Sequence, residues 1–297
     1  MVIKMKFVAY LLLYNRIEGS EVLNETINDM LTYLKEVDTL YIFNYHKYSQ
    51  KTLIDVLKIY KNIEYVDLPD RGQVANYSDA VKHAITVNAD YVTVIEKGYF
   101  YEDNSFHEIK RMIIQKEIDD SVAVITPIPV LTCESKNDTK EASREVKGAK
   151  LTGAFINLHI YKQTEGFYLP YYQTTIDYDY CLTVRHMGYK VLLMNNLILR
   201  NRNFKMLTKN FLWHHYYGYA RGVYELYYET RNRMYLWEKF KNIDPQYIKI
   251  DKKIQSAEIK EMRLFEKKFK EKKNIMKQAR FDYRIGKMGK AFEEINF

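Results

Sequence analysis

The sequence predicts an α/β protein, with a mostly parallel sheet flanked by helices and a helical C-terminal extension. Two observations carry this prediction. Strand-like and helix-like segments alternate through the first two hundred residues, as they do in parallel sheets with helices on both faces. After about residue 205 long helical segments replace the alternation. The 297 residues suffice for one domain with an appended lobe, so we expect an α/β domain over residues 1–205 and a helical extension over residues 206–297.

Short apolar runs predict the strands, and apolar residues at helical spacing predict the helices. The run at residues 7–14 is too short to cross a membrane and indicates a buried central strand. Val22, Ile27 and Met30 have the spacing of one helix face. Strands are expected at residues 6–13, 39–43, 63–67, 91–95 and 122–125. Helices are expected at residues 22–37, 50–60, 76–88 and 106–115.

Three later segments differ from this pattern. Residues 133–150 are polar and charged, which predicts a loop. The aromatic residues 211–241 and the basic residues 247–278 are each expected to be helical. In the basic segment the apolar residues that recur at roughly helical spacing are Ile250, Ile254, Met262, Phe265 and Phe269. This segment therefore reads as an amphipathic helix.

The positive charge of the chain is concentrated near its C-terminus. The formal net charge is +8, and residues 249–290 hold fifteen lysines and arginines against six acidic residues. Such an excess indicates a polyanionic partner. Acidic residues are interleaved and no nucleic-acid-binding signature is present, so we favour an anionic membrane surface over nucleic acid. The alternative is a packing helix whose lysines face solvent.

The cysteine pattern bears on the compartment. Cys133 and Cys181 stand alone, without the spacing of metal ligands. Isolated cysteines are typical of a reducing compartment, where they remain buried, inert thiols. We therefore expect a cytoplasmic protein, either soluble or held peripherally at the inner face of the membrane.

The most informative segment runs from Leu169 to Gly188. It places Asp177 and Asp179 between a tyrosine-rich loop and an amphipathic stretch that ends in Gly188. A carboxylate next to an open loop suits a general base that takes a proton from a hydroxyl. The alternative is that both carboxylates cap the following helix.

Seven further segments share the order and spacing of a known motif set. They are Leu13-Tyr14-Asn15-Arg16, Ile42-Phe43-Asn44, Gly72-Gln-Val-Ala-Asn76, Glu96-Lys97-Gly98, Leu151-Thr152-Gly153-Ala-Phe155, Glu165-Gly166-Phe167 and Tyr227-Tyr228-Glu-Thr-Arg231-Asn232-Arg233-Met-Tyr235. Together with the segment around Asp177 they resemble family 2 glycosyltransferases of the GT-A fold. The branch they resemble is that of bacterial rhamnosyltransferases of surface-polysaccharide assembly. The last segment is the most specific match.

The resemblance implies an inverting transferase that moves a sugar such as rhamnose from a nucleotide diphosphate donor to a glycan or lipid-linked acceptor. It implies Asp177 as the base, with Asp179 supporting the acceptor loop. The residues implied on the nucleotide-sugar side are Tyr14, Asn15, Arg16, Asn44, Gly72, Asn76, Glu96 and Lys97. Those implied on the acceptor side are Thr152, Gly153, Arg231, Asn232 and Arg233.

Four positions depart from the family pattern. Gly98 stands where the metal-binding D-x-D has its second Asp, and glycine has no side chain to ligate Mg or Mn. Phe43 replaces an Asp that contacts the base, Thr183 replaces an Arg, and residues 199–202 lack the family's metal-contacting His. These departures imply that Mg or Mn is held weakly, through Glu96 or through donor phosphates, or not at all.

Two hypotheses follow from these losses. In the first, cations such as Lys97, Arg200 or Arg202 neutralise the leaving diphosphate and the chain is an active transferase. In the second, the chain is a catalytically degenerate homologue that acts as a binding or assembly partner. The presence of Asp177 favours the first.

Overall fold

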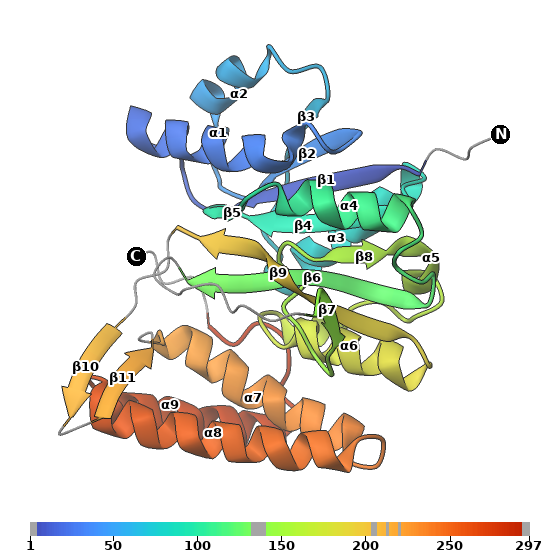
Figure 1. Cartoon of the computed structure of the whole chain (residues 1–297). Coiled ribbons are helices and arrows are strands. Elements are labelled where there is room, and N and C mark those ends of the chain that lie inside the picture. The colour runs from blue at the N-terminus through green and yellow to red at the C-terminus, as the bar shows by residue number, and fades with distance from the viewer. Residues whose placement is uncertain (1–4, 132–140, 203–206, 212–213, 219–220, 293–297) are drawn as a thin grey trace.

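The computed structural model describes residues 5–131, 141–202, 207–211, 214–218 and 221–292, and a nine-stranded sheet forms its centre (Figure 1). The strand order is β3-β2-β1-β4-β8-β6-β9-β5, with β7 paired to β9. The first half is parallel and consists of β1 (Phe7–Leu13), β2 (Thr39–Asn44), β3 (Ile63–Asp67) and β4 (Tyr91–Glu96).

The second half of the sheet is mixed. Strand β6 (Val122–Leu131) runs parallel to β9 (Lys190–Asn201). Strands β5 (Tyr99–Tyr101) and β7 (Ser143–Glu145) pair antiparallel with β9, and β8 (Phe155–Asn157) lies antiparallel between β4 and β6. The α/β class is therefore confirmed. Strand β7 falls inside the segment that the sequence predicts as a loop, and β6 extends past its predicted end.

The helices of this part are α1 (Ser20–Leu34), α2 (Lys51–Leu57), α3 (Gln73–Thr86), α4 (Ser105–Ile114), α5 (Leu158–Tyr161), the 3₁₀ turn η1 (Leu169–Tyr171) and α6 (Ile176–His186). Every residue of β1 is buried, because helices cover both faces of the sheet. Its alternate residues enter two cores: Tyr10 packs on the side of α3 and α6, and Leu11 on the side of α1 and α4.

The carboxyl ends of β1, β2 and β4 gather at one edge of the sheet, because these strands are parallel. Tyr14 follows β1, Asn44 ends β2 and Glu96 ends β4. Ligands of open α/β sheets bind at such edges. The candidate site is therefore built there.

The C-terminal part differs from its prediction in two places. Residues 214–218, predicted within the aromatic helix 211–241, form strand β11 (His214–Gly218), which pairs with β10 (Leu207–Phe211), and α7 (Val223–Phe240) follows. The predicted basic helix is two helices, α8 (Pro245–Phe265) and α9 (Phe269–Arg284), because Lys268 adopts a φ of 59° that breaks the helix. Figure 1 shows α7, α8 and α9 together on one side of the sheet domain.

This break divides the set of five apolar residues that the sequence places on one helix face, Ile250, Ile254, Met262, Phe265 and Phe269. Met262 and Phe269 pack with Leu226 and Met276 in a small core between the helices. Ile250 and Ile254 are instead about half exposed, at 48% and 47%. Lys272, one of the lysines of this basic segment, is buried and ion-paired with Glu266. The five apolar residues thus do not form one continuous exposed face.

Cys181 is buried, as predicted, and its burial raises the pKa of the thiol to about 12. A thiol of that pKa is inert at neutral pH, because the thiolate is the reactive form. Cys133 lies outside the described residues.

Candidate active site

A pocket of about 220 Å³ lies at the carboxyl end of β4. Its charged lining residues are Glu96, Lys150, Asp177 and Glu225. Residues 81 positions apart in the sequence, Glu96 and Asp177, thus lie in one pocket. The sequence predicted both, and the fold brings them together.

Glu96 ends β4 and is fixed by two neutral donors. Gln73 donates a hydrogen bond to its Oε1 at 2.8 Å, and the Tyr77 hydroxyl donates to the same oxygen at 3.2 Å. Burial raises the pKa of the Glu96 carboxyl, and these two hydrogen bonds oppose the rise. Asp177 raises this pKa further and Lys150 lowers it, so the three charged groups act on one another electrostatically.

Asp177 lies in the first turn of α6 and is held by a backbone amide from outside its own helix. Its Oδ1 accepts a hydrogen bond from the Leu151 amide at 2.9 Å. Its Oδ2 receives the Lys150 ammonium at 3.2 Å. The N-cap residue of α6, Thr175, makes no capping hydrogen bond through its side chain, and Asp177 binds the 150–151 segment rather than capping its own helix. One carboxylate oxygen is thereby anchored while the other meets a cation in the pocket.

Asp179 faces the other way. Successive helical residues differ by about 100°, so residues two apart point to nearly opposite sides. Asp179 is buried and accepts hydrogen bonds from the Tyr171 hydroxyl at 2.7 Å and from the Lys239 ammonium of α7. It joins α6 to η1 and α7, and it is not among the described residues that line the 220 Å³ pocket.

The loop before Asp177 has an unusual backbone. Tyr172, Thr174 and Thr175 all have positive φ, at 65°, 57° and 68°. Non-glycine residues seldom adopt this conformation, so neighbouring structure must hold it.

The holding residues come from α7. Arg231 donates to the Tyr171 carbonyl at 3.1 Å and to the Gly289 carbonyl at 2.9 Å. Asn232 donates to the carbonyls of Tyr171 and Gln173. Both side chains are fully buried and bond backbone carbonyls, whereas the resemblance implied a place for them on the acceptor side. The most specific motif of the sequence thus shapes the loop that precedes Asp177.

Arg233, the third residue implied on the acceptor side, does reach an open surface. It lines a groove of about 290 Å³ between α6, α7 and α8, where it is ion-paired with Asp251 and Glu258. The groove shares Lys150, Thr174 and Glu225 with the smaller pocket, so the two cavities adjoin. Its apolar and aromatic wall comprises Tyr178, Leu236, Tyr247, Ile250 and Ile254.

Thr152 and Gly153 lie between the pocket and the sheet. The Thr152 hydroxyl pairs with that of Tyr77 at 2.6 Å and lines the pocket. Gly153 is buried, with a φ of 69°, and a Cβ there would meet Leu199 at 2.5 Å. Gly153 therefore allows the segment before β8 to pack closely against Leu199 of β9.

The residues implied on the nucleotide side fall into two groups. Asn44 and Asn76 are fully buried, and their hydrogen bonds hold the β2–α2 connection and residues 70–71. Gly72 has a φ of 95° and lies against Tyr172, which leaves no room for a side chain. These three residues shape loops rather than offer side chains to a ligand.

The other members of that set lie nearer the surface. Arg16 lines an open pocket of about 740 Å³ between the β1–α1 and β2–α2 connections. The neighbouring residue Asn15 accepts a hydrogen bond through its backbone carbonyl from Gln50, which also lines this pocket. Tyr14 stacks on Tyr45 at 5.7 Å. Lys97 occupies the turn between β4 and β5.

The metal-binding capacity of the site is low. In the described part of the chain no three His, Cys, Asp or Glu side chains are grouped to hold a metal ion. Gly98, with a φ of 92°, contributes no ligand next to Glu96, whose Oε1 already accepts two hydrogen bonds. Divalent cations such as Mg²⁺ require several oxygen ligands, and these residues do not fit a protein-held metal of that kind.

The two arginines predicted as substitute cations form ion pairs with residues outside the pocket. Arg200 forms an ion pair with Glu102 at 2.9 Å, and Arg202 with Asp29 at 2.7 Å. Neither is among the described residues that line the pocket. Among the described residues that line the pocket, the cation is Lys150, which the sequence predicted only as part of a polar loop. Its only sequence signal is its position directly before the Leu151-Thr152-Gly153 motif.

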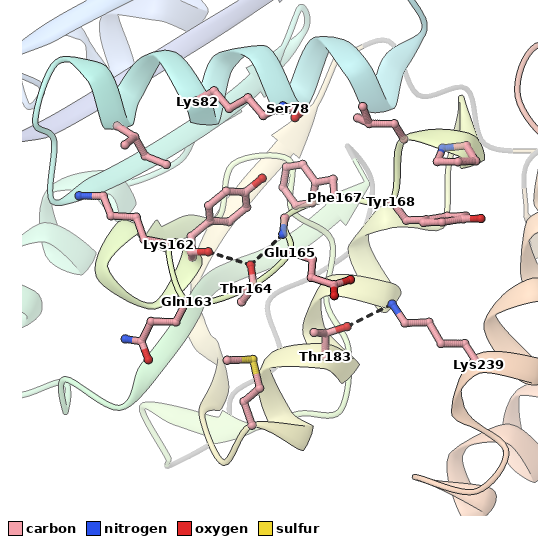
Figure 2. A pocket seen from close by; sticks show the side chains of 16 residues that line it. Ser78, Lys82, Lys162, Gln163, Thr164, Glu165, Phe167, Tyr168, Thr183 and Lys239 are labelled. Atoms are coloured by element: carbon pink, nitrogen blue, oxygen red, sulfur yellow. Dashed lines mark hydrogen bonds between the residues drawn. The ribbon is translucent and has the colours of Figure 1, made fainter.

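Another pocket lies on the other side of α6 (Figure 2). It encloses about 760 Å³, and its walls come from α3, the segment between α5 and η1, α6 and α7. Figure 2 shows Lys239 pointing toward Thr183, which it approaches at 3.5 Å. This pocket holds neither Glu96 nor Asp177 among its described lining residues.

Comparisons with known proteins agree on the fold. No protein-family model and no curated sequence matches the chain. The crystal structure of GalNAc-T7 with UDP, GalNAc and Mn²⁺ is similar, with a TM-score of 0.59 and 10% identity over 94% of this chain and 57% of that chain. The structure of S. aureus TarS 1-349 in complex with UDP-GlcNAc has a TM-score of 0.52 and 11% identity over 80% of this chain and 67% of that one. Both are GT-A glycosyltransferases, and the GT-A fold is thereby confirmed for this chain, which spans little more than half of the GalNAc-T7 chain.

Proposed function

We propose that the chain is an inverting glycosyltransferase that uses a nucleotide diphosphate sugar. The observation that carries the proposal is the 220 Å³ pocket, which joins Asp177 to Glu96 at the carboxyl end of β4 in a GT-A fold. A carboxylate anchored through one oxygen leaves the other to accept a proton, as a general base must. Two solved structures of this fold hold UDP or UDP-GlcNAc, which supports a nucleotide sugar as donor.

The reaction follows from the placement of Asp177. An acceptor hydroxyl attacks the anomeric carbon of the donor sugar, and its proton passes to Oδ2 of Asp177. The new bond joins the acceptor oxygen to that carbon, and the bond from the carbon to the diphosphate oxygen breaks. The nucleotide diphosphate departs with the bonding electrons. Attack from the side opposite to the leaving group inverts the anomeric configuration.

The groove that adjoins the pocket is the proposed path of the acceptor. It leads from the pocket that holds Asp177 past Tyr178, which is about one-third exposed (36%), to Ile250 and Ile254. Aromatic rings offer an apolar face to sugars and a polar edge to their hydroxyls. A glycan of surface-polysaccharide synthesis, with rhamnose as a candidate donor sugar, is the substrate class that the sequence motifs suggest for this path.

The proposed setting is the cytoplasmic face of a membrane. In the described residues no helix is both long and apolar enough to cross a bilayer. Lys267, Lys268, Lys270 and Lys273 are exposed around the α8–α9 junction and supply positive charge for an anionic surface. Contact would rest on these lysines rather than on the predicted apolar stripe.

A catalytically degenerate homologue is the second candidate. The scarcity of metal ligands favours it, as does the ion pair that engages Asp177 with Lys150. Such a protein would bind a nucleotide sugar or a glycan and form no product.

A donor screen separates the two candidates. The purified full chain is incubated with UDP-, dTDP- and GDP-sugars, and release of the nucleotide diphosphate is followed with and without Mn²⁺. We expect slow hydrolysis of at least one donor by wild-type protein and its loss in Asp177→Asn. Binding of a donor without any release, in both proteins, would support the degenerate homologue instead.

A further inference from the structure

The proposed reaction places a diphosphate in a pocket that is already lined by three carboxylates, those of Glu96, Asp177 and Glu225. A donor diphosphate brings about two negative charges next to Glu96 and Asp177. Negative charges that share one small pocket repel strongly where solvent is partly excluded. A cation is therefore required at this position, and within the part of the chain that the structure describes no three His, Cys, Asp or Glu side chains are grouped to hold a metal ion.

Lys150 is the cation that the fold supplies at this position. It lines the same pocket as Glu96, and its ammonium lies 3.2 Å from Oδ2 of Asp177. Its electrostatic influence reaches Glu96 and Tyr99 as well. The Lys150 side chain is 56% exposed, so its head can move within the pocket without unpacking the core.

The backbone next to Lys150 is fixed. Leu151 is fully buried, its amide is bonded to Asp177, and Gly153 donates a hydrogen bond to the Val94 carbonyl at 2.8 Å. The base and the cation are therefore positioned by adjacent residues of one short segment. A flexible ammonium on a fixed backbone suits transfer from one anion to another.

We propose that the Lys150 ammonium, rather than a divalent metal held by the protein, neutralises the donor diphosphate. In moving toward the phosphate oxygens it leaves Oδ2 of Asp177, which is then able to take the acceptor proton. Donor binding thereby frees Oδ2 of Asp177 to act as the general base. The ammonium stays protonated throughout, and it balances the charge that develops on the departing nucleotide diphosphate as the bond to the sugar breaks. This inference rests on the proposed function, because it assumes a nucleotide diphosphate donor.

Calorimetry with UDP and dTDP tests the proposal. Titrations are run in EDTA and in Mn²⁺ with the full chain, as wild type, Lys150→Ala, Lys150→Arg and Lys162→Ala. Lys162 is an exposed lysine of the pocket in Figure 2 and serves as the matched control. Thermal melts accompany each variant, and little change is expected for Lys150→Ala because the side chain is half exposed.

The expected result is that EDTA leaves wild-type affinity nearly unchanged for at least one nucleotide. Lys150→Ala should weaken that binding by about tenfold or more, which corresponds to about 1.4 kcal/mol. Lys150→Arg should retain most of it, and Lys162→Ala all of it. Wild-type binding that depends on Mn²⁺, or unchanged affinity in Lys150→Ala, would overturn the inference while leaving the proposed function standing. Failure of wild type to bind either nucleotide in both buffers would count against the donor class itself, and hence against both proposals.

Discussion

The two sides of helix α6 hold carboxylates that are two residues apart and have different surroundings. Asp177 faces a small pocket with a half-exposed lysine, and its second oxygen meets a group that is able to move. Asp179 faces the helical extension, where the Tyr171 hydroxyl and Lys239 fix both of its oxygens. The comparison separates a carboxylate that meets a lysine in a pocket, Asp177, from a carboxylate that links α6 to η1 and α7, Asp179. Sequence spacing alone does not make that distinction.

The largest expected effect sets these two residues against each other. Asp177→Asn should lower turnover by about two orders of magnitude or more, the usual contribution of a general base, with little change in Tm. Asp179→Asn should instead lower stability by about 1–3 kcal/mol, because it weakens charged hydrogen bonds. Turnover and Tm of both variants are the measurements. Equal losses of activity without loss of stability would remove the distinction between the two sides.

The second effect concerns the hydrogen bonds by which Arg231 and Asn232 of α7 hold the loop before Asp177. Arg231→Ala should destabilise the protein by about 3 kcal/mol or more, because the buried guanidinium bonds two carbonyls and supports a loop with positive φ. Its activity should fall as well, since Asp177 follows that loop. Denaturant unfolding measures the change, with the exposed Arg280→Ala as control. Similar stability in the two variants would mean that the loop holds its shape without Arg231.

The third effect concerns the close packing of Gly153 against Leu199 of β9 beside the pocket. Gly153→Ala should cost about 1–3 kcal/mol, because a positive φ and a 2.5 Å contact with Leu199 act together. Gly188→Ala has a positive φ of 90° and nothing within 4 Å, so its cost should be smaller. The difference between their unfolding free energies isolates the steric part. A larger cost at Gly188 would contradict the packing described for Gly153.

The smallest effect is a pH dependence at Glu96. Burial raises its pKa above the ordinary 4.5, so the folded state binds this proton more tightly than the unfolded state does. The resulting stabilisation is present at low pH and is lost as pH rises through the folded-state pKa. Glu96→Gln keeps an acceptor oxygen for Gln73 and Tyr77 but carries no charge. We expect a higher Tm than wild type at pH 7.5 and a difference that disappears near pH 4. A variant less stable at both pH values would contradict the cause given for the shift.

Much of the α/β part could be predicted, because a short, wholly apolar run such as β1 indicates a strand that is buried on both faces of a sheet. Glu96 and Asp177 could be predicted from motif order. The roles of Arg231 and Asn232 could not, because a motif does not say whether an arginine meets a ligand or a backbone carbonyl. Lys150 was missed since a lysine in a polar stretch has no periodicity. In the extension, the tyrosine-rich β11 satisfies strand preferences as well as helical ones.

The stereochemistry of donor hydrolysis tests the central claim most directly. Time-resolved proton NMR of the sugar released by wild type and Asp177→Asn needs no knowledge of the acceptor, because water takes its place. The account predicts that the first sugar formed has the anomeric configuration opposite to that of the donor, and that its rate of formation falls by about a hundredfold or more in Asp177→Asn. A first product with the donor's own configuration, or an unchanged rate in the variant, would contradict it.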